Sequence, residues 1–247
     1  MKILIKIRKW SQLFFFLVSA VLFYLFITNT LQVIHKFCPF SLICFGTLSG
    51  KTGQWIYPLS LLIFGLLTLS AIWLGRWFCG FVCIFGTLQE WIYRLFHKKC
   101  QPVLKINKLD EKRLAAFKYI VLLATVILSL FGLSRIYMAY CPVMISGWIK
   151  TASVYGISFI LLVLAGSIFI ERLWCRYLCP YAALMNLMAF VGRSFNLKRW
   201  RLKRNLETCI DCGICSRFCP MYIDLLEEEE INNLNCIKCF RCIDKCP

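Results

Sequence analysis

The C-terminal part of the chain carries eight cysteines in two runs of identical spacing. The runs read CIDCGICSRFCP and CIKCFRCIDKCP, and both follow the pattern C-x2-C-x2-C-x3-C-P. Thiolates are soft ligands that select zinc, copper(I) and iron–sulfur clusters. Disulfides are disfavoured in the cytosol, which is where the charge pattern described below places this part of the chain. The eight thiols therefore indicate metal ligation.

The spacing favours iron–sulfur clusters over zinc. In the doubled run of bacterial two-cluster ferredoxins, the fourth cysteine of each run ligates the other cluster. Structural zinc sites pair two cysteine knuckles, and eight thiols in this spacing would be an unusual way to build them. We therefore predict two [4Fe–4S] clusters. Their ligands are Cys209, Cys212, Cys215 and Cys246 for the first cluster, and Cys236, Cys239, Cys242 and Cys219 for the second.

Two further pairs of cysteines each stand four residues apart. One pair lies in GRWFCGFVCIFGTL and the other in ERLWCRYLCPYAAL, and an arginine precedes each pair by three residues. The pairs are Cys79 with Cys83 and Cys175 with Cys179. Residues i and i+4 share one face of a helix, so each pair is able to point one way. Pro180 biases Cys179 away from helical geometry and marks the end of that helix.

Brought together, these four thiols would hold a third iron–sulfur cluster near the cytosolic surface of the membrane. Buried thiolates are costly without compensation, and three nearby arginines are able to offset their charge. These are Arg76, Arg172 and Arg176. The alternatives are thiol redox chemistry and inert packing, because free cysteine is a good small core residue.

The elements that position these thiols are apolar helices. Hydrophobic residues make up 60% of the 247 residues, whereas about 45–50% is usual for a soluble domain. A bilayer-spanning helix needs about 20 apolar residues. Four stretches are long enough: Leu13–Ile34, Trp55–Trp73, Ala115–Leu133 and Val154–Ile170. We predict an all-α membrane protein with four transmembrane helices and a small C-terminal dicluster ferredoxin domain of bacterial type.

This fold divides the chain into three parts. We expect a transmembrane domain over residues 1–192, a basic linker over 193–206 and the ferredoxin domain over 207–247. The basic start leads into the first apolar stretch without a small-residue cleavage site, so it predicts an uncleaved anchor. The sequence ends at Pro247, directly after the last predicted ligand, so we expect a shortened domain or cover supplied by a partner.

The distribution of Lys and Arg predicts the orientation. These residues are concentrated at the N-terminus, between the second and third apolar stretches, and after the fourth. Cytoplasmic segments carry such an excess, so we predict a multi-pass protein of the cytoplasmic membrane with both termini in the cytosol. The net charge of +17 is then mostly this signal together with attraction to anionic lipid headgroups. Nucleic acid is not an expected partner, because no recognition motif accompanies the charge.

The cysteines also reveal an internal repeat. Cys38-Pro39 and Cys141-Pro142 follow the first and third apolar stretches, and the two C-x3-C pairs follow the second and fourth. The pattern indicates a duplicated helical hairpin, with two halves related by a pseudo-two-fold axis along the membrane normal. The alternative is coincidence among many cysteines.

The combination of GRWFCGFVC, RLWCRYLCPYAAL and the doubled cysteine run resembles the NapH/NosR/CcoG-type polytopic membrane ferredoxins. The resemblance covers the chain from its first apolar stretch to its end. It implies four or more spans, cytosolic clusters, and electron exchange with quinols, periplasmic redox partners or metal ions. One copy departs from the family pattern, because Ile84 follows Cys83 where Pro180 follows Cys179. That departure puts the role of Cys79 and Cys83 in doubt.

These features predict a one-electron carrier. Electrons would pass between the cytosolic-side clusters and a membrane quinone or an extracytoplasmic partner. The protein would act as an electron-transfer subunit of a larger oxidoreductase complex of the quinol dehydrogenase kind. His35 and Glu171 are candidates for accepting a quinol proton, although an ordinary hydrogen bond for His35 and an ion pair with an arginine for Glu171 are alternatives.

Two other functions stay open. The first is a maturation factor that reduces a metal ion such as copper, with Cys38, Cys44 and Cys141 as its contacts. Cys38 and Cys141 are also candidates for a disulfide, and Cys100 is expected to be a plain thiol. The second is an iron–sulfur redox sensor that transfers no net electrons.

Overall fold

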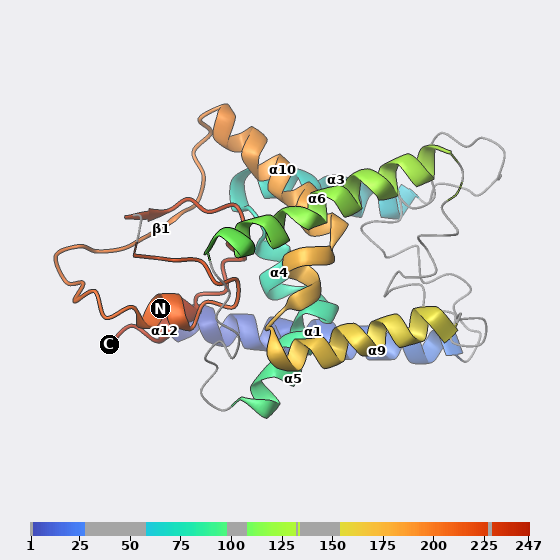
Figure 1. The fold of residues 1–247 in the computed structure, drawn as a ribbon, viewed down its shortest axis with the longest axis horizontal. Helices are drawn as coiled ribbons and strands as arrows, with labels where there is room; N and C mark the ends of the chain where they lie inside the picture. The colour runs from blue at the N-terminus through green and yellow to red at the C-terminus, as the bar shows by residue number, and fades with distance from the viewer. Residues whose placement is uncertain (1, 28–57, 98–107, 132, 134–153, 227–228) are drawn as a thin grey trace.

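The computed structural model describes residues 2–27, 58–97, 108–131, 133, 154–226 and 229–247. Most of these residues are helical (Figure 1). The helices are α1 (Lys2–Ile27), α3 (Pro58–Leu74), α4 (Trp77–Phe81), α5 (Ile84–Phe96), α6 (Lys108–Leu130), α9 (Val154–Phe169), η2 (Trp174–Leu178), α10 (Pro180–Ser194), α11 (Ile214–Arg217) and α12 (Arg241–Asp244). The strands are β1 (Leu202–Lys203) and β2 (Glu230–Ile231). The predictions for His35, Cys38, Cys44, Cys100 and Cys141 concern residues outside the described ranges.

Four long helices lie where the sequence predicts apolar spans. Within the described ranges, Asp110–Leu130 of α6 is the one segment whose length and hydropathy suffice to cross a bilayer. The apolar parts of α3 and α9, Leu61–Leu74 and Val154–Phe169, are shorter. In α1 the apolar run begins only after the basic first turns. The number of spans therefore stays a prediction.

All four long helices present apolar side chains on their outer faces. The exposed fraction is 60% for Phe14 of α1, 63% for Leu66 of α3, 61% for Leu123 of α6 and 69% for Leu162 of α9. Soluble monomers rarely expose contiguous apolar surface on this scale. These faces suit an apolar surrounding such as lipid.

The two halves of the chain interlock. Helix α5 of the first half packs against α1 and against α9 of the second half, whereas α10 of the second half packs against α6 and against α3 of the first. Figure 1 shows α1, α5 and α9 in its lower part and α3, α6 and α10 in its upper part. The prediction of a duplicated four-helix hairpin is not confirmed. Each half instead contributes one long helix to the packing of the other.

The C-terminal tail folds around a small antiparallel sheet. Leu202 of β1 pairs with Ile231 of β2, and Lys203 pairs with Glu230. Strand β1 comes from the segment predicted to be a linker, so that segment takes part in the fold of the tail. Helices α11 and α12 contact each other, and each begins after a residue with a left-handed backbone, Gly213 or Phe240.

One of the two hydrophobic cores in the described residues joins the tail to the helices. Met185 of α10 and Cys79 of α4 belong to the same buried group as Ile237 and Cys239 of the tail. Burial of such side chains contributes roughly 1.5–3 kcal/mol each for the larger ones. The tail is thus packed onto the helical part rather than tethered beside it.

Candidate iron–sulfur sites

The two C-x3-C stretches have the same backbone geometry. The N–H of Cys83 donates to the carbonyl of Phe78 at 3.0 Å, and the N–H of Cys179 donates to the carbonyl of Trp174 at 2.8 Å. Both bonds reach back five residues, as in a single turn of π-helix, a feature frequent at functional sites. The chain then becomes extended at the second cysteine, and a new helix begins. The predicted helix end at Cys179 is therefore confirmed, and the first copy has the same break at Cys83.

The missing proline in the first copy does not change this geometry. Cys83 has φ −64° and ψ 108°, and Cys179 has φ −71° and ψ 114°. Ile84 and Pro180 then occupy the first position of α5 and α10, where the backbone N–H has no partner within the helix. The doubt raised by Ile84 therefore has no basis in the backbone.

The four thiols of the two copies converge. Cys79 and Cys175 are buried, while Cys83 and Cys179 are partly buried. A hydrogen bond joins Cys175 to Cys83 across the copies, and it lowers the pKa of Cys83 to about 6 and raises the pKa of Cys175 well above its usual value. Burial, followed by the charges of Cys79 and Cys83, raises the pKa of Cys179 to about 12. The four thiols therefore lie near one another, and their ligation of a third cluster stays a prediction.

Two arginines link the copies reciprocally. Arg76 donates from Nη2 to the carbonyl of Cys175 at 2.8 Å, and Arg172 donates from Nη1 to the carbonyl of Cys79. Both side chains are fully buried. Arg172 holds a left-handed backbone with φ 57°, a strained conformation that persists only where surrounding contacts fix it. Each arginine therefore fixes the first cysteine of the opposite copy and brings positive charge to the thiols.

The third predicted arginine has a different role. The Arg176 Nε donates to Glu111 of α6 at 2.5 Å, and its guanidinium lies 3.6 Å from the ring centroid of Tyr222 in the tail. The prediction that Arg176 offsets thiolate charge is therefore wrong. Its charge is balanced by Glu111, and it connects the second copy to α6 and to the tail.

A buried carboxylate that the sequence analysis did not single out supports the first copy. Glu90 of α5 is fully buried and accepts from Arg8 and Arg172 at 2.6 Å each, and from Arg94. Burial raises the pKa of this carboxyl, but the three arginines outweigh it and hold the pKa well below the usual range. The signal available in the sequence was an acidic residue between apolar residues of the segment IFGTLQEWIYRLF, four residues before Arg94.

Several cations taken as an orientation signal are structural. Arg8, for example, donates from Nε to the carbonyl of Gly80 at 3.1 Å, next to Cys79. The buried cations of this orientation signal are Arg8, Arg76, Lys118, Arg172 and Arg176, and in the tail Lys238 and Arg241 are buried as well. Part of the positive charge is thus neutralised by partners inside the molecule. The net charge therefore reflects membrane orientation less than predicted.

The second cysteine run of the tail lies beside the fourth cysteine of the first run. One cavity is lined by Cys219, Cys236, Cys239 and Cys242, and eight mostly aliphatic residues complete its wall. Burial, followed by the charge of Cys239, raises the pKa of Cys219. Four thiols around one apolar cavity fit the donor set of a [4Fe–4S] cluster, and they are the four that the crossed assignment predicts. Among the described residues, no three His, Cys, Asp or Glu side chains lie close enough to hold a single metal ion.

The other tail cysteines lie nearer the surface. Cys212 and Cys246 are exposed, while Cys209 and Cys215 are partly buried. Arg204 approaches the Cys209 sulfur to 3.8 Å. The two predicted tail sites therefore differ in depth.

The second run docks directly on the first C-x3-C copy. A Cβ added to Gly80 would lie 2.3 Å from the carbonyl oxygen of Ile237, so only glycine allows this approach. Phe240 packs edge-on against Phe81 of α4, with ring centroids 6.0 Å apart.

Glu171 forms a buried ion pair of 2.6 Å with Arg241 of α12, so the arginine-paired alternative holds for this carboxylate.

Comparison with known proteins agrees with these sites. Residues 201–247 match the family described as "4Fe-4S dicluster domain". The family described as "4Fe-4S binding domain" matches twice, over residues 56–101 and 153–198. Each of these two matches contains one C-x3-C pair.

Three relatives are informative. An uncharacterized protein of Methanocaldococcus jannaschii is 33% identical over 97% of this chain and 91% of its own length. The regulatory protein NosR of Pseudomonas aeruginosa is 32% identical over 75% of this chain. The ferredoxin-type protein NapH of Escherichia coli is 24% identical over 69% of this chain.

The chain belongs to the NapH/NosR-type ferredoxin family. The alignment spans 59% of the length of NapH and 27% of that of NosR, so it corresponds to only part of those proteins. No solved structure matches the chain. For this NapH/NosR-type ferredoxin, the double match of one iron–sulfur family agrees with the repeat read from the cysteines in these two segments.

Proposed function

We propose that this NapH/NosR-type ferredoxin is a multi-pass membrane protein that carries electrons between a cytosolic redox partner and a membrane quinone or extracytoplasmic partner, as a subunit of a larger redox complex. The observation that carries the proposal is the contact between the tail and the first C-x3-C copy. Ile237, which lies between two cysteines of the tail cavity, rests on Gly80, the residue after Cys79.

Three groups of thiols at increasing depth support this function. Cys209, Cys212, Cys215 and Cys246 form the outer set, Cys219, Cys236, Cys239 and Cys242 the middle set, and Cys79, Cys83, Cys175 and Cys179 the inner set. Iron–sulfur clusters bound there would supply one-electron carriers whose potentials depend on burial and on hydrogen bonds to sulfur. One hydrophobic core contains or contacts all four thiols of the middle set together with Cys79 and Cys179 of the inner set, and a second core contains Cys175.

The inner set is the part of the proposal that rests most on this structure. Its thiols come equally from both copies, and the reciprocal arginines Arg76 and Arg172 supply the compensating charge that buried thiolates require. The apolar outer faces of α1, α3, α6 and α9 support placement of the helices in lipid, with the tail on the cytosolic side. Under this proposal the chain divides into a transmembrane domain (1–192), a linker that contributes β1 (193–206) and the dicluster domain (207–247).

A quinone reoxidation experiment tests the proposal. The full chain is purified anaerobically, placed in nanodiscs that contain menaquinone, and compared with discs that lack it after stoichiometric reduction with dithionite. We expect the paramagnetic resonance signal of the reduced tail clusters to disappear only where quinone is present. Replacing Cys175 and Cys179 with Ser should leave dithionite reduction of the tail intact but abolish the quinone-dependent step. Equal reoxidation rates in the variant and the parent would show that the inner thiols do not carry the electrons.

A further inference from the structure

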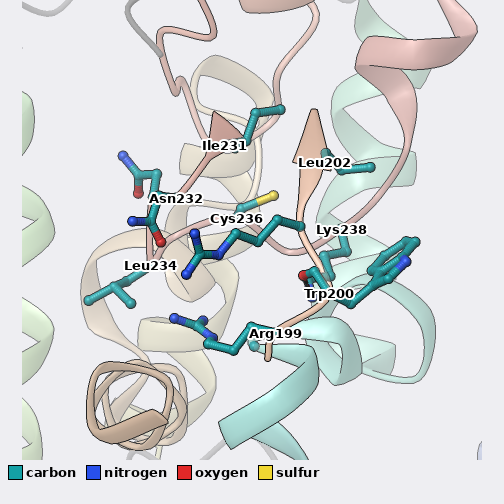
Figure 2. Close-up of a pocket in the computed structure, with 11 residues that line it drawn as sticks. Arg199, Trp200, Leu202, Ile231, Asn232, Leu234, Cys236 and Lys238 are labelled. Carbon is teal, nitrogen blue, oxygen red and sulfur yellow. Dashed lines mark hydrogen bonds between the residues drawn. The ribbon is translucent and has the colours of Figure 1, made fainter. Parts of the chain in front are cut away.

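A basic pocket lies between the end of α3, the segment that leads into β1, and the second cysteine run of the tail (Figure 2). Three cations line it, Arg199, Arg201 and Lys238, and no carboxylate does. Figure 2 shows Lys238 on one side of the pocket, Asn232 on the other, and Cys236 between them. The pocket therefore adjoins the middle set of thiols but is separate from the cavity that those thiols line.

Arg199 has donors in this pocket that no described group satisfies. Its Nε and Nη1 atoms are buried, and neither has an acceptor within the described part of the chain. A guanidinium stays charged in proteins, so its cost of burial must be met by an acceptor or a counter-charge. Arg199 as a whole is partly buried, and burial, followed by the charges of Arg201 and Arg193, lowers its pKa.

The other two cations can also make further hydrogen bonds. Lys238 donates from Nζ to the carbonyl of Trp200 at 2.6 Å, and an ammonium group has two further donors. Arg201 pairs with Glu230 at 2.9 Å, but that carboxylate is shared with Lys203 and lies outside the pocket wall. Three cations thus line one pocket, and no carboxylate of the described residues lines it.

A structural role at the end of α3 does not account for this arrangement. The C-terminus of a helix favours a nearby cation, and Arg199 Nη2 would lie 3.8 Å from a Cβ placed on Gly75, just after α3. The contact that joins the two segments, however, is the Trp200 N–H donating to the carbonyl of Trp73 at 3.3 Å. The helix end helps to place Arg199 but leaves its donors directed at the pocket.

We propose that this pocket binds a phosphate group. A phosphate offers several charged acceptor oxygens, and arginine presents parallel donors that match them. The source is either the headgroup of an anionic phospholipid or a free phosphate compound. The flanking segment carries exposed apolar side chains, Phe195 and Trp200 among them, together with further cations. This combination is typical of a segment that lies in a lipid headgroup layer, and it favours the phospholipid.

The test measures binding directly and needs no electron transfer. The full chain is placed in phosphatidylcholine nanodiscs, and inorganic phosphate is titrated by calorimetry. In parallel, protein from phosphatidylglycerol-containing discs is examined by native mass spectrometry for retained phosphatidylglycerol. The variant is Arg199→Gln. The matched control is Arg193→Gln, which removes an exposed arginine from the same segment but outside the pocket.

We expect Arg199→Gln to weaken phosphate binding by about tenfold or more, as loss of a charged hydrogen bond does, and to abolish retention of phosphatidylglycerol. Arg193→Gln should leave both unchanged. Lys238→Gln serves the same purpose should Arg199→Gln fail to fold. Retained lipid in the parent identifies a phospholipid, and phosphate binding without retained lipid identifies a free phosphate compound. Binding of neither probe to the parent, or equal losses in the pocket and control variants, would overturn the proposal. The quinone experiment stands whichever result is found.

Discussion

The two C-x3-C copies share their backbone but differ in what they contact. Both close a five-residue turn at the second cysteine, and both send an arginine to the first cysteine of the other copy. They differ at two corresponding pairs of positions. Gly80 corresponds to Arg176, and Glu90 corresponds to Asn186. The features that the copies share position the thiols. The residues that differ allow the single tail to make a different contact with each copy.

The tail uses each copy differently. On the first copy, Gly80 admits the backbone of Ile237. On the second, Arg176 stacks on Tyr222 and pairs with Glu111. A single tail cannot make the same contact with both members of a symmetric pair. The site therefore has equal geometry around the sulfur atoms and unequal geometry at the surface on which the tail docks.

The largest predicted difference between the copies is at Glu90. Glu90→Ala would leave Arg8 and Arg172 buried without their carboxylate, and breaking a buried ion pair costs about 3–5 kcal/mol. At the corresponding position, Asn186 has its side-chain amide 2.9 Å from that of Asn235, and Asn186→Ala removes hydrogen bonds worth about 1–3 kcal/mol. Thermal unfolding in detergent should show a larger fall in Tm for Glu90→Ala. Equal shifts would contradict this division of roles.

The next effect concerns docking of the tail. Gly80→Ala places a methyl group 2.3 Å from the Ile237 carbonyl, so the tail must shift, at a cost of about 1–3 kcal/mol. Limited proteolysis should cut residues 193–206 faster in this variant. Gly65→Ala in α3 is the matched control, because its added methyl group would meet nothing within 4 Å. The docking model fails if Gly80→Ala leaves cleavage as slow as in the control.

The smallest effect tests the one departure from the family pattern. Ile84→Pro gives the first copy the residue of the second, at a position that needs no backbone donor. We expect intact iron content and a change in stability within about 1 kcal/mol, because proline restricts the unfolded chain where its geometry already fits. Pro180→Ile should be similarly mild. Loss of iron in Ile84→Pro would show that the two copies are less alike than their backbones indicate.

The sequence was sufficient to predict the elements whose signals are local. Spacing suggested the tail ligand sets, which stay a prediction, although the four thiols of one set line a single cavity. The apolar stretches placed α6 and α9 within a few residues of their ends, apart from the basic first turns of α6. The start of α1 was missed because its basic residues were taken as lying before the span. Arg8 is instead buried against Glu90, 82 residues away in sequence.

Long-range contacts account for the rest. The exchange of α3 and α9 between the halves depends on packing that no single stretch reveals. The sequence does not indicate that the tail docks at Gly80, because a glycine needed for close backbone approach cannot be told from other glycines by sequence alone. Arg176 was grouped with Arg76 by proximity to cysteine, although its acceptor, Glu111, lies on α6. The cysteines of the candidate site could thus be named from the sequence. The charged residues and packing contacts that position them could not.

The most direct test of the central claim, that both copies supply one shared inner cluster, is iron and acid-labile sulfide content after anaerobic purification. Two tail clusters account for about eight iron atoms per chain, and a third raises the count to about twelve. We predict about twelve for the parent and about eight for each of three variants, with Ser replacing Cys79 and Cys83, Cys175 and Cys179, or all four. A parent count of about eight, or loss of iron from only one of the two pairs, would contradict the account.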